Sequence, residues 1–336
     1  MTEKQTNQLG ILLVGSGSAV PEQIINNNQL ASRVETSDEW ITTRTGIRER
    51  RIISNQESLL DLCSNAGSNA ISMAGWDPKT IDLVILATST PDDLFGSAAK
   101  VQAAVGAKEA FAFDLTAACS GFLFALVTAA QYLRNGSINR ALVIGADQIS
   151  SWVDWDDRKS CVLFGDGAGA VALEASQTEN GLIGFQFKSD GSRGDCLTLP
   201  QKRNFEQLVQ GNDFQQGNFS TIQMNGQEVY KFAVREVPAI LEDLLNMHEI
   251  HSDSLDWLLL HQANQRIIDA VATRFKIPQS KVLTNLAQYG NTSAATIPLL
   301  LDQAVRANKV KKNDLIATSG FGAGLSWGAA LIKWHG

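Results

Sequence analysis

Cys119 lies in a sequence context that is typical of a reactive thiol. It stands in Phe-Asp-Leu-Thr-Ala-Ala-Cys-Ser-Gly-Phe, between a short apolar run at 111–115 and a longer one at 121–133. The first run predicts a buried strand, and the second has the length of a helix. At a strand-to-helix turn, backbone N–H groups and the helix dipole stabilise a thiolate. The alternative is a buried, inert thiol, because free cysteine is one of the most buried residue types.

His261 and Asn291 are two further candidates for the same chemistry. His261 follows an apolar strand predicted at 257–260, and ligands bind at strand ends in α/β sheets. Asn291 stands in Tyr-Gly-Asn-Thr-Ser, which taken alone is a turn and helix N-cap signal. Each residue alone is more often structural. Together with Cys119 they offer one nucleophile and two hydrogen-bond donors to a single oxygen.

The elements that must position these residues alternate between strands and helices. Apolar runs predict strands at 11–14, 83–87, 111–115, 141–145 and 168–174, with helical stretches between them. This alternation favours a layered α/β fold. The stretch Pro200 to Ser220 is rich in Gln, Asn and Gly, and it predicts a loop over the surface of the core.

An internal repeat spans about half of the chain. The segment Ile81–Ala87 resembles Leu255–His261 at an offset of 174 residues (261 − 87). The strand at 141–146, which leads into Leu-Phe-Gly-Asp-Gly-Ala-Gly-Ala, resembles 314–319, which leads into Gly-Phe-Gly-Ala-Gly-Leu-Ser-Trp-Gly. Matched segments in one order at nearly one offset favour a duplication over the chance likeness of two α/β halves.

The duplication predicts where the candidate residues meet. In this register Cys119 corresponds to about Asn291, an offset of 172 residues (291 − 119). If the halves pack with pseudo-two-fold symmetry, Cys119, His261 and Asn291 converge. We therefore expect an N-terminal half over 1–178 that carries the cysteine, and a C-terminal half over 179–336 that carries the histidine and the asparagine.

Composition excludes several classes of protein. The 336 residues are 44% hydrophobic and 19% charged, which is enough for one large domain or two intimate ones. The net charge of −7 argues against a nucleic-acid binder that depends on a basic face. Four widely spaced cysteines predict neither a zinc site nor a disulfide framework. Without a signal peptide or a membrane-length apolar run, we expect a cytoplasmic protein.

Two motifs are rejected as ligand sites. The segment 14–21 begins like a dinucleotide loop, but it lacks the third glycine, and Pro21 breaks the helix that should follow. The aspartates at 154, 156 and 157 lack the full spacing and the closing glutamate of a calcium loop.

Five segments resemble β-ketoacyl-acyl-carrier-protein synthase III. The resemblance runs from about Leu12 to the C-terminus, with the motifs in the family's order, and together they are highly specific. It implies a thiolase-like α/β fold: duplicated βαβαβαββ halves that form a five-layered α-β-α-β-α core, in agreement with the repeat. The segments are Ser37–Arg50, Ala117–Gly121, Leu163–Ala170, His261–Asn264 and Tyr289–Ala294.

The resemblance implies a decarboxylative condensation. Cys119 would take the acyl group of acetyl-CoA or another short acyl-CoA as a thioester. Malonyl-acyl carrier protein would then enter, and His261 and Asn291 would donate to its thioester carbonyl and stabilise the enolate left by loss of CO2. The enolate would attack the acyl group, whose oxyanion the backbone N–H groups of Cys119 and Ala323 would hold. No metal or redox cofactor is required.

The resemblance also implies contacts for CoA. Trp40 would stack on the adenine end and Arg44 would pair with it, while Arg158 would make another contact. Gln227 stands where the family often has Asn, so no direct contact is expected from it. The pantetheine tunnel and the acyl pocket would involve Gly226, Lys231, Ala263 and Phe321, with Phe95 closing the pocket across a homodimer interface.

A segment for docking the carrier protein is implied as well. Carrier proteins are acidic, so an acidic enzyme needs a basic patch near the tunnel mouth, and Arg266 is the best candidate for it. The docking segment consists of Gln262, Ala263, Asn264, Gln265 and Arg266.

Three alternative functions compete with this interpretation. The nearest is a family relative that primes or transfers acyl groups in secondary metabolism. Hydroxymethylglutaryl-CoA synthase uses a glutamate base and does not decarboxylate, and Asn291 in Gly-Asn-Thr-Ser argues against it. A non-catalytic thiolase-fold protein that binds the carrier would not need an intact cysteine, histidine and asparagine set.

Overall fold

A computed structural model describes residues 8–336 and contains two five-stranded sheets with the same topology. In each sheet three neighbouring strands pair in parallel, the fourth strand pairs antiparallel with them, and the fifth pairs antiparallel with the fourth. The first sheet has the order β1 (Gly10–Ala19), β7 (Gly167–Ser176), β6 (Arg140–Asp147), β4 (Leu83–Ala87) and β5 (Phe111–Leu115). The second has the order β8 (Leu182–Ser189), β16 (Ser326–Lys333), β15 (Leu315–Gly322), β13 (Trp257–Leu260) and β14 (Val282–Leu283).

The central strands form where the sequence is continuously apolar. Every residue of β4 is buried, as is most of β6. Parallel strands with helices on both faces have this pattern, because neither face meets water. The predicted strands at 83–87, 111–115 and 257–260 are confirmed with these bounds, and the other predicted strands lie within β1, β6 and β7.

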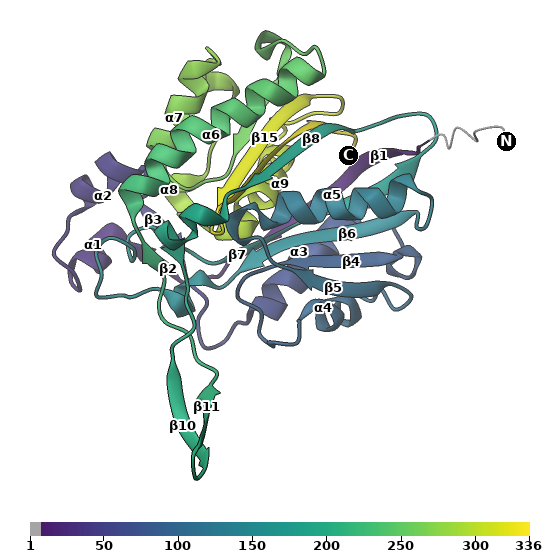
Figure 1. Ribbon diagram of the computed structural model, residues 1–336. Helices are drawn as coiled ribbons and strands as arrows, with labels where there is room; N and C mark the ends of the chain where they lie inside the picture. The colour runs from purple at the N-terminus through teal and green to yellow at the C-terminus, as the bar shows by residue number, and fades with distance from the viewer. Residues whose placement is uncertain (1–7) are drawn as a thin grey trace.

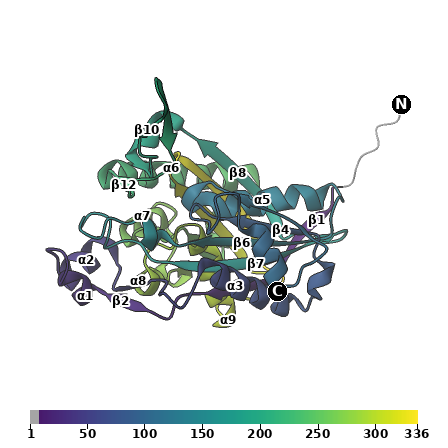
Figure 2. The ribbon, with the colours of Figure 1, turned by 90° about the horizontal axis from the view of Figure 1, so that it is seen from below.

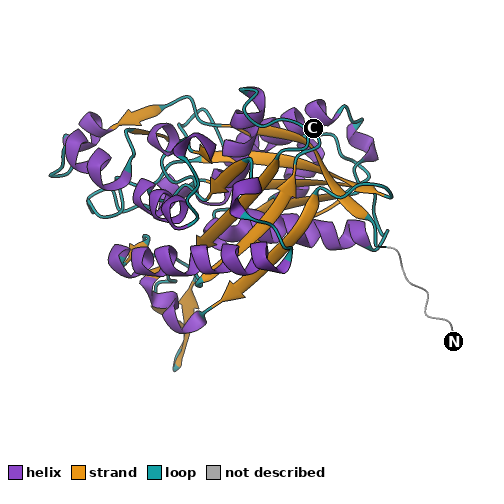
Figure 3. Cartoon of the chain, turned by 90° about the horizontal axis from the view of Figure 1, so that it is seen from above, coloured by secondary structure: helices purple, strands orange, loops and turns teal. Residues whose placement is uncertain are grey.

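Helices form three layers, one between the two sheets and one on the outer face of each (Figures 1 and 3). The outer face of the first sheet is covered by α3 (Leu59–Ala74) and α4 (Ala98–Ala104). Between the sheets lie α5 (Gly121–Arg134) and α9 (Thr296–Arg306). The outer face of the second sheet is covered by α6 (Gly226–Met247) and α7 (Gln265–Arg274). The predicted five-layered α-β-α-β-α core is therefore confirmed.

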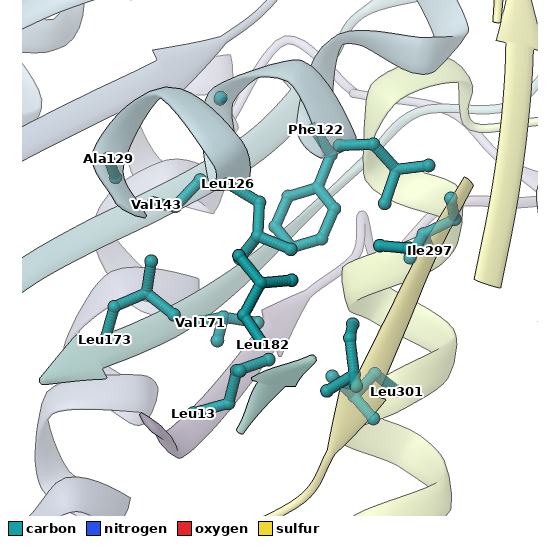
Figure 4. Close-up of a cluster of buried hydrophobic side chains, with 14 of the residues drawn as sticks. Leu13, Phe122, Leu126, Ala129, Val143, Val171, Leu173, Leu182, Ile297 and Leu301 are labelled. Carbon is teal, nitrogen blue, oxygen red and sulfur yellow. The ribbon is translucent and has the colours of Figure 1, made fainter. Parts of the chain in front are cut away.

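The central layer joins the two sheets through one apolar core (Figure 4). Phe122 of α5 and Ile297 of α9 are almost fully buried, and both pack into the cluster that contains strand residues of both sheets. The starts of the two helices also approach closely, since a Cβ at Gly121 would lie 3.7 Å from the Cβ of Ala294. This packing fixes the N-termini of α5 and α9 against each other, which is where the candidate residues lie.

Smaller elements cap the sheets at the end of the molecule away from the start of β1 (Figures 1 and 2). They are α1 (Asn27–Ala31), α2 (Asp38–Thr45), α8 (Leu286–Tyr289), and the strand pairs β2 (Ile24–Asn26) with β3 (Glu49–Arg51) and β9 (Leu197–Thr198) with β12 (Gln223–Met224).

The predicted loop at 200–220 is in part a β-hairpin. Strands β10 (Asn204–Val209) and β11 (Asn212–Gln216) pair across a tight turn in which Gly211 has a φ of 83°. Nearly all their residues are exposed, so the segment is a surface excursion as expected (Figure 1). The prediction of a plain loop was wrong because a hairpin exposed on both faces has no apolar alternation to reveal it.

The rejected dinucleotide-like segment is part of a strand. β1 continues through Ala19, and α3 packs on its glycines. A Cβ at Gly15 would lie 2.9 Å from the backbone nitrogen of Ala74, so the glycine permits close helix-to-strand packing. Across residues 8–336, no helix has both the length and the apolar character needed to cross a bilayer.

Candidate active site

Cys119 lies in a single 3-10 turn, Ala118–Ser120, between β5 and α5. Its side chain is buried, and the Ser293 hydroxyl lies 3.4 Å from the sulfur as a hydrogen-bond donor. Burial raises the pKa of the Cys119 thiol to about 12, although the Ser293 hydrogen bond lowers it. The strand-to-helix turn was predicted correctly, but the resting residue is a thiol rather than a thiolate, because the loss of water outweighs that hydrogen bond.

Asn291 is held by the N-terminal half of the chain. Its backbone N–H donates to the Leu163 carbonyl at 2.9 Å, and its carbonyl accepts from the Gly165 N–H at 3.1 Å. The side-chain Oδ1 accepts from the Ser293 N–H at 2.9 Å. With its oxygen engaged, the amide offers its NH2 group to the cavity that Asn291 lines.

His261 follows β13, as predicted, and is 2% exposed. Its backbone N–H donates to the Ser319 carbonyl at 2.9 Å, and its ring stands edge-on to Phe321. Nδ1 lies 2.6 Å from the Thr296 hydroxyl, which leaves Nε2 for the cavity. Burial lowers the pKa of His261 to about 3, so the imidazole is neutral near pH 7.

One cavity of about 110 Å³ brings the three predicted residues together. Cys119, His261 and Asn291 all line it, and Phe321 and Ala263 line it as well. The arrangement places a nucleophile and two neutral hydrogen-bond donors around one small volume, which suits chemistry at a thioester.

The structure corrects the register of the duplication. The turn before α5 and the turn Ser293–Ala295 before α9 are equivalent, and each begins at a residue with positive φ, Ala118 at 48° and Ser293 at 52°. The offset here is 175 residues (293 − 118), so Cys119 corresponds to Ala294. Asn291 lies three residues before that position, because the sequence register was extended from the strands without seeing these turns.

Sequence reasoning missed Ser293 and Thr296. Both are buried and both contact the predicted residues directly. They follow Asn291 in a stretch that was interpreted as a small-residue helix start. A signal was present, since two hydroxyl residues on a predicted buried turn need hydrogen-bond partners.

The turn after β15 packs on the backbone of Cys119. A Cβ at Gly322 would lie 2.6 Å from the Cys119 nitrogen, so only glycine permits this approach. Ala323 directly follows the glycine that contacts Cys119. This position is compatible with the backbone N–H groups of Cys119 and Ala323 donating to one oxygen.

The predicted CoA residues surround a surface hollow next to the cavity. Arg44 and Arg158 each lie over the Trp40 ring, at 4.5 and 4.9 Å from its centre. Trp40 and Gly226 line the hollow, and Gly226 also lines the Cys119 cavity. The hollow at Trp40 and the cavity at the thiol therefore share lining residues, Met224 and Gly226. Lys231 forms an ion pair with Glu228 at 2.9 Å and is not among the residues of either lining.

The predicted docking segment divides into an internal and an external part. Gln262 is fully buried, where its Nε2 donates to the Leu260 carbonyl at 2.7 Å and its Oε1 accepts from Thr284 at 3.0 Å. A surface contact from Gln262 is therefore ruled out by this geometry. Asn264 caps α7 by accepting from the Arg266 N–H, and the exposed Arg266 lies over Tyr230. Ala263 and Gln265 are partly exposed.

Phe95 lies outside the Cys119 cavity of its own chain. It is fully exposed, and the neighbouring Leu94 is 83% exposed. Both line a separate hollow that reaches Thr116, three residues before Cys119.

His261 is expected to stay neutral from pH 5 to 8, because burial holds its pKa near 3. The imidazole resonance that disappears in His261→Asn should show no NMR titration over this range. A midpoint near 6.5 for His261 would contradict the buried, neutral state.

The lowered pKa of His261 also predicts how the free energy of unfolding depends on pH. Above pH 6.5 His261 is neutral in both folded and unfolded chains, so its contribution is complete. As the pH falls from 6.5 towards 3, the unfolded chain binds the proton first, and about 1.4 kcal/mol of stability is lost per pH unit. Urea unfolding of His261→Asn should lack this component.

Comparisons with known proteins agree with this geometry. Two family models match, 3-oxoacyl-[acyl-carrier-protein (ACP)] synthase III over residues 113–191 and its C-terminal domain over 245–334. A β-ketoacyl-[acyl-carrier-protein] synthase III of Prochlorococcus marinus strain MIT 9313 is 69% identical, over 100% of this chain and 99% of its own.

Solved structures show the same fold. The 3-oxoacyl-[acyl-carrier-protein] synthase III of Aquifex aeolicus VF5 is 40% identical with a TM-score of 0.88, covering 97% of this chain and 100% of its own. The priming β-ketosynthase of the R1128 polyketide pathway is 31% identical with the same TM-score, covering 98% and 97%. Among residues 8–336, no cluster of three His, Cys, Asp or Glu side chains is arranged to hold a metal ion.

Proposed function

Because the chain belongs to the β-ketoacyl-acyl-carrier-protein synthase III family, we propose that Cys119, His261 and Asn291 perform that family's reaction here. The protein is an acyltransferase that initiates fatty-acid synthesis by condensing acetyl-CoA with malonyl-acyl carrier protein. The products are acetoacetyl-acyl carrier protein, CO2 and CoA. The observation that carries the residue assignment is the shared cavity of these three side chains.

Acyl transfer is the first step. The Cys119 sulfur attacks the acetyl-CoA carbonyl, the C–S bond to CoA breaks, and the thiol proton ends on the CoA sulfur. The tetrahedral oxyanion accepts hydrogen bonds from the N–H groups of Cys119 and Ala323. Support comes from Gly322, whose missing side chain lets this turn reach the Cys119 nitrogen.

Decarboxylation follows when the malonyl thioester enters. Asn291 Nδ2 and His261 Nε2 donate to the thioester oxygen and stabilise the enolate as CO2 leaves. For Nε2 to carry a hydrogen, Nδ1 must accept one from the Thr296 hydroxyl, which lies 2.6 Å away. The hydroxyl hydrogen of Thr296 then points to Nδ1 and not to the Ser293 carbonyl at 3.0 Å. A neutral imidazole suits a donor that must not give up its proton. The enolate carbon then attacks the acetyl carbonyl, and the Cys119 sulfur leaves.

Binding of CoA is assigned to the hollow at Trp40. The adenine ring would insert beside Trp40, with Arg44 and Arg158 contributing charge and stacking. Gly226, Ala263 and Phe321 line the inner path for pantetheine and acyl group. The roughly 110 Å³ of the cavity suits a short acyl group, because an engineered cavity of about 150 Å³ holds benzene.

Trp40→Ala should therefore raise KM for acetyl-CoA about tenfold, since stacking on a base contributes about 1–3 kcal/mol. The value of kcat and the KM for malonyl-acyl carrier protein should change little. Steady-state kinetics with each substrate varied in turn checks this, and Trp76→Ala is a control, because Trp76 lies in a core cluster away from the hollow. An equal rise in both KM values would exclude a specific CoA contact.

The carrier protein is proposed to dock on Ala263, Asn264, Gln265 and Arg266, with Gln262 serving only to hold the segment from inside. The charge of Arg266 at the rim of the cavity supports this, since carrier proteins are acidic. No cofactor is required by the reaction as written. A cytoplasmic location is supported by the free thiols of Cys63, Cys119, Cys161 and Cys196.

A homodimer is proposed to form at β5. This strand is an edge of the first sheet, and exposed apolar side chains gather near it at Leu94, Phe95 and Phe111. Such an edge favours pairing with a second copy. Phe95 would then reach the acyl pocket of the partner. We also propose the division into halves at 178/179, which falls between the strands of the two sheets.

A two-stage labelling experiment tests the proposal. The protein is incubated with acetyl-CoA labelled in the acetyl group, and the label is located by peptide mapping; malonyl-acyl carrier protein is then added. Label should reach Cys119, and the second addition should release CO2 and move the label to the carrier. Label on another residue would overturn the assignment. If the acetylated protein does not react with malonyl-acyl carrier protein but transfers its label to another acceptor, a role in secondary metabolism would be favoured.

A further inference from the structure

Ser293 contacts two of the three proposed catalytic residues directly and is linked to the third through Thr296. Its hydroxyl donates to Cys119 Sγ at 3.4 Å, and its N–H donates to Asn291 Oδ1 at 2.9 Å. Its carbonyl lies 3.0 Å from the Thr296 hydroxyl, the group that contacts His261 Nδ1. Ser293 is 2% exposed, so water does not compete for these groups. Two polar groups of Ser293 thus reach the nucleophile and one of the two donors, and its third polar group reaches a neighbour of the other donor.

The backbone of Ser293 adopts a conformation that L-residues disfavour. Its φ of 52° lies in the left-handed region, where glycine is usual. The Asp147 carboxylate at the end of β6 holds the turn in place, because its Oδ2 accepts from the Ala294 N–H at 3.1 Å. Asp147 is fully buried and is fixed in turn by Ser89 and Thr90 of the N-terminal half. A serine kept at a strained position points to a use for its side chain.

The two equivalent turns show what the side chain adds. Ala118, the counterpart of Ser293 before α5, has the same left-handed φ and no polar side chain. The turn geometry therefore does not itself require a hydroxyl. In the turn before α9, the hydroxyl donates to the Cys119 sulfur at 3.4 Å, and the Asp147 carboxylate is an alternative acceptor for the same hydrogen. A hydroxyl with two such neighbours can turn its hydrogen to the sulfur when the thiol loses its proton.

We propose that Ser293 is a positioning residue for Cys119 and Asn291, and that its hydroxyl stabilises the Cys119 sulfur as a thiolate during acyl transfer. Its backbone N–H orients the Asn291 amide. The inference rests on the proposed roles of Cys119 and Asn291. It predicts separate consequences for the hydroxyl, which serves acyl transfer, and for the backbone, which serves decarboxylation.

Ser293→Gly removes the CH2OH side chain, keeps the backbone N–H and carbonyl, and fits the left-handed backbone without strain. The rate of Cys119 acetylation should fall roughly ten- to hundredfold, because hydrogen bonds to charged groups contribute more than neutral ones. Decarboxylation of malonyl-acyl carrier protein should stay within about threefold of wild type, because the backbone N–H remains. Thr292→Val is the matched control: in the described structure its buried hydroxyl has no hydrogen-bond partner, and all rates should persist.

Alkylation of Cys119 by iodoacetamide at pH 9 separates this role from a merely structural one. Loss of thiolate stabilisation should slow alkylation in Ser293→Gly, whereas a loosened turn would expose the thiol and speed it. Unchanged or faster alkylation, or equal losses of acetylation and decarboxylation, would overturn the proposal. Wild-type protein that fails to acetylate Cys119 would instead refute the proposed function itself.

Discussion

Cys119→Ala is expected to abolish both covalent labelling by acetyl-CoA and formation of acetoacetyl-acyl carrier protein. The acyl group has no other carrier in the cavity, since Cys119 is the one thiol in its lining. Loss of a covalent nucleophile removes the pathway rather than slowing it, so we expect activity to fall by at least about 10³-fold. Decarboxylation should persist, because His261 and Asn291 remain in place.

The matched control is Cys63→Ala. Cys63 is also a fully buried free thiol, but it lies on α3 in the outer core cluster. Burial raises its pKa well above the usual value, as it does for Cys119. Labelling and turnover of Cys63→Ala should match wild type once its folding is verified by circular dichroism. Stoichiometric labelling of Cys119→Ala would show that another residue carries the acyl group.

The burial of Cys119 also sets the sign of a pH effect. Its folded pKa of about 12 lies above the usual value of 9, so the thiol is favoured by folding. Between pH 9 and 12 the unfolded chain loses the proton first, and stability falls as the pH rises. Acyl transfer therefore needs help in reaching the thiolate, which is the role that the Ser293 hydroxyl can fill.

The fold could be predicted from the sequence where a pattern has one physical interpretation. The continuous apolar run 83–87 is buried on both faces, and its bounds were predicted without error. The run 111–115 has the predicted bounds as well, but it is partly exposed and not buried as predicted. The duplication was detectable because each half must place equivalent strands in equivalent sheets. His261 was placed correctly since it directly follows such a run.

The remainder depended on contacts between the halves. Ser293 and Thr296 look like ordinary helix-start residues until the turn before α9 is packed against Cys119. The sequence predicts Gln262 to be a surface residue, but in the structure its amide donates to the Leu260 carbonyl and accepts from the Thr284 hydroxyl. The register error of three residues has the same origin, because the turns that define equivalence are set by backbone angles. Such pairings are long-range and leave no local periodicity.

Asn291→Asp and His261→Ala are expected to separate the two stages of the reaction. Asn291→Asp keeps the oxygen that accepts from the Ser293 N–H but loses the donor, and His261→Ala loses the other donor. Loss of one preorganised donor to an oxyanion costs about 10²–10³ in rate. We therefore expect CO2 release from malonyl-acyl carrier protein to fall by that factor in each variant.

Acetylation of Cys119 should remain near the wild-type rate in both variants, because in the proposed mechanism its oxyanion accepts from the backbone N–H groups of Cys119 and Ala323. Asn285→Ala is a suitable control, since Asn285 is a buried asparagine whose amide pairs with Gln303 outside the cavity lining. Rapid-quench labelling and CO2 release measured on the same samples decide the question. A parallel loss of acetylation and decarboxylation would mean that the side-chain and backbone donors serve a single oxyanion, because removing one donor would then slow both stages alike.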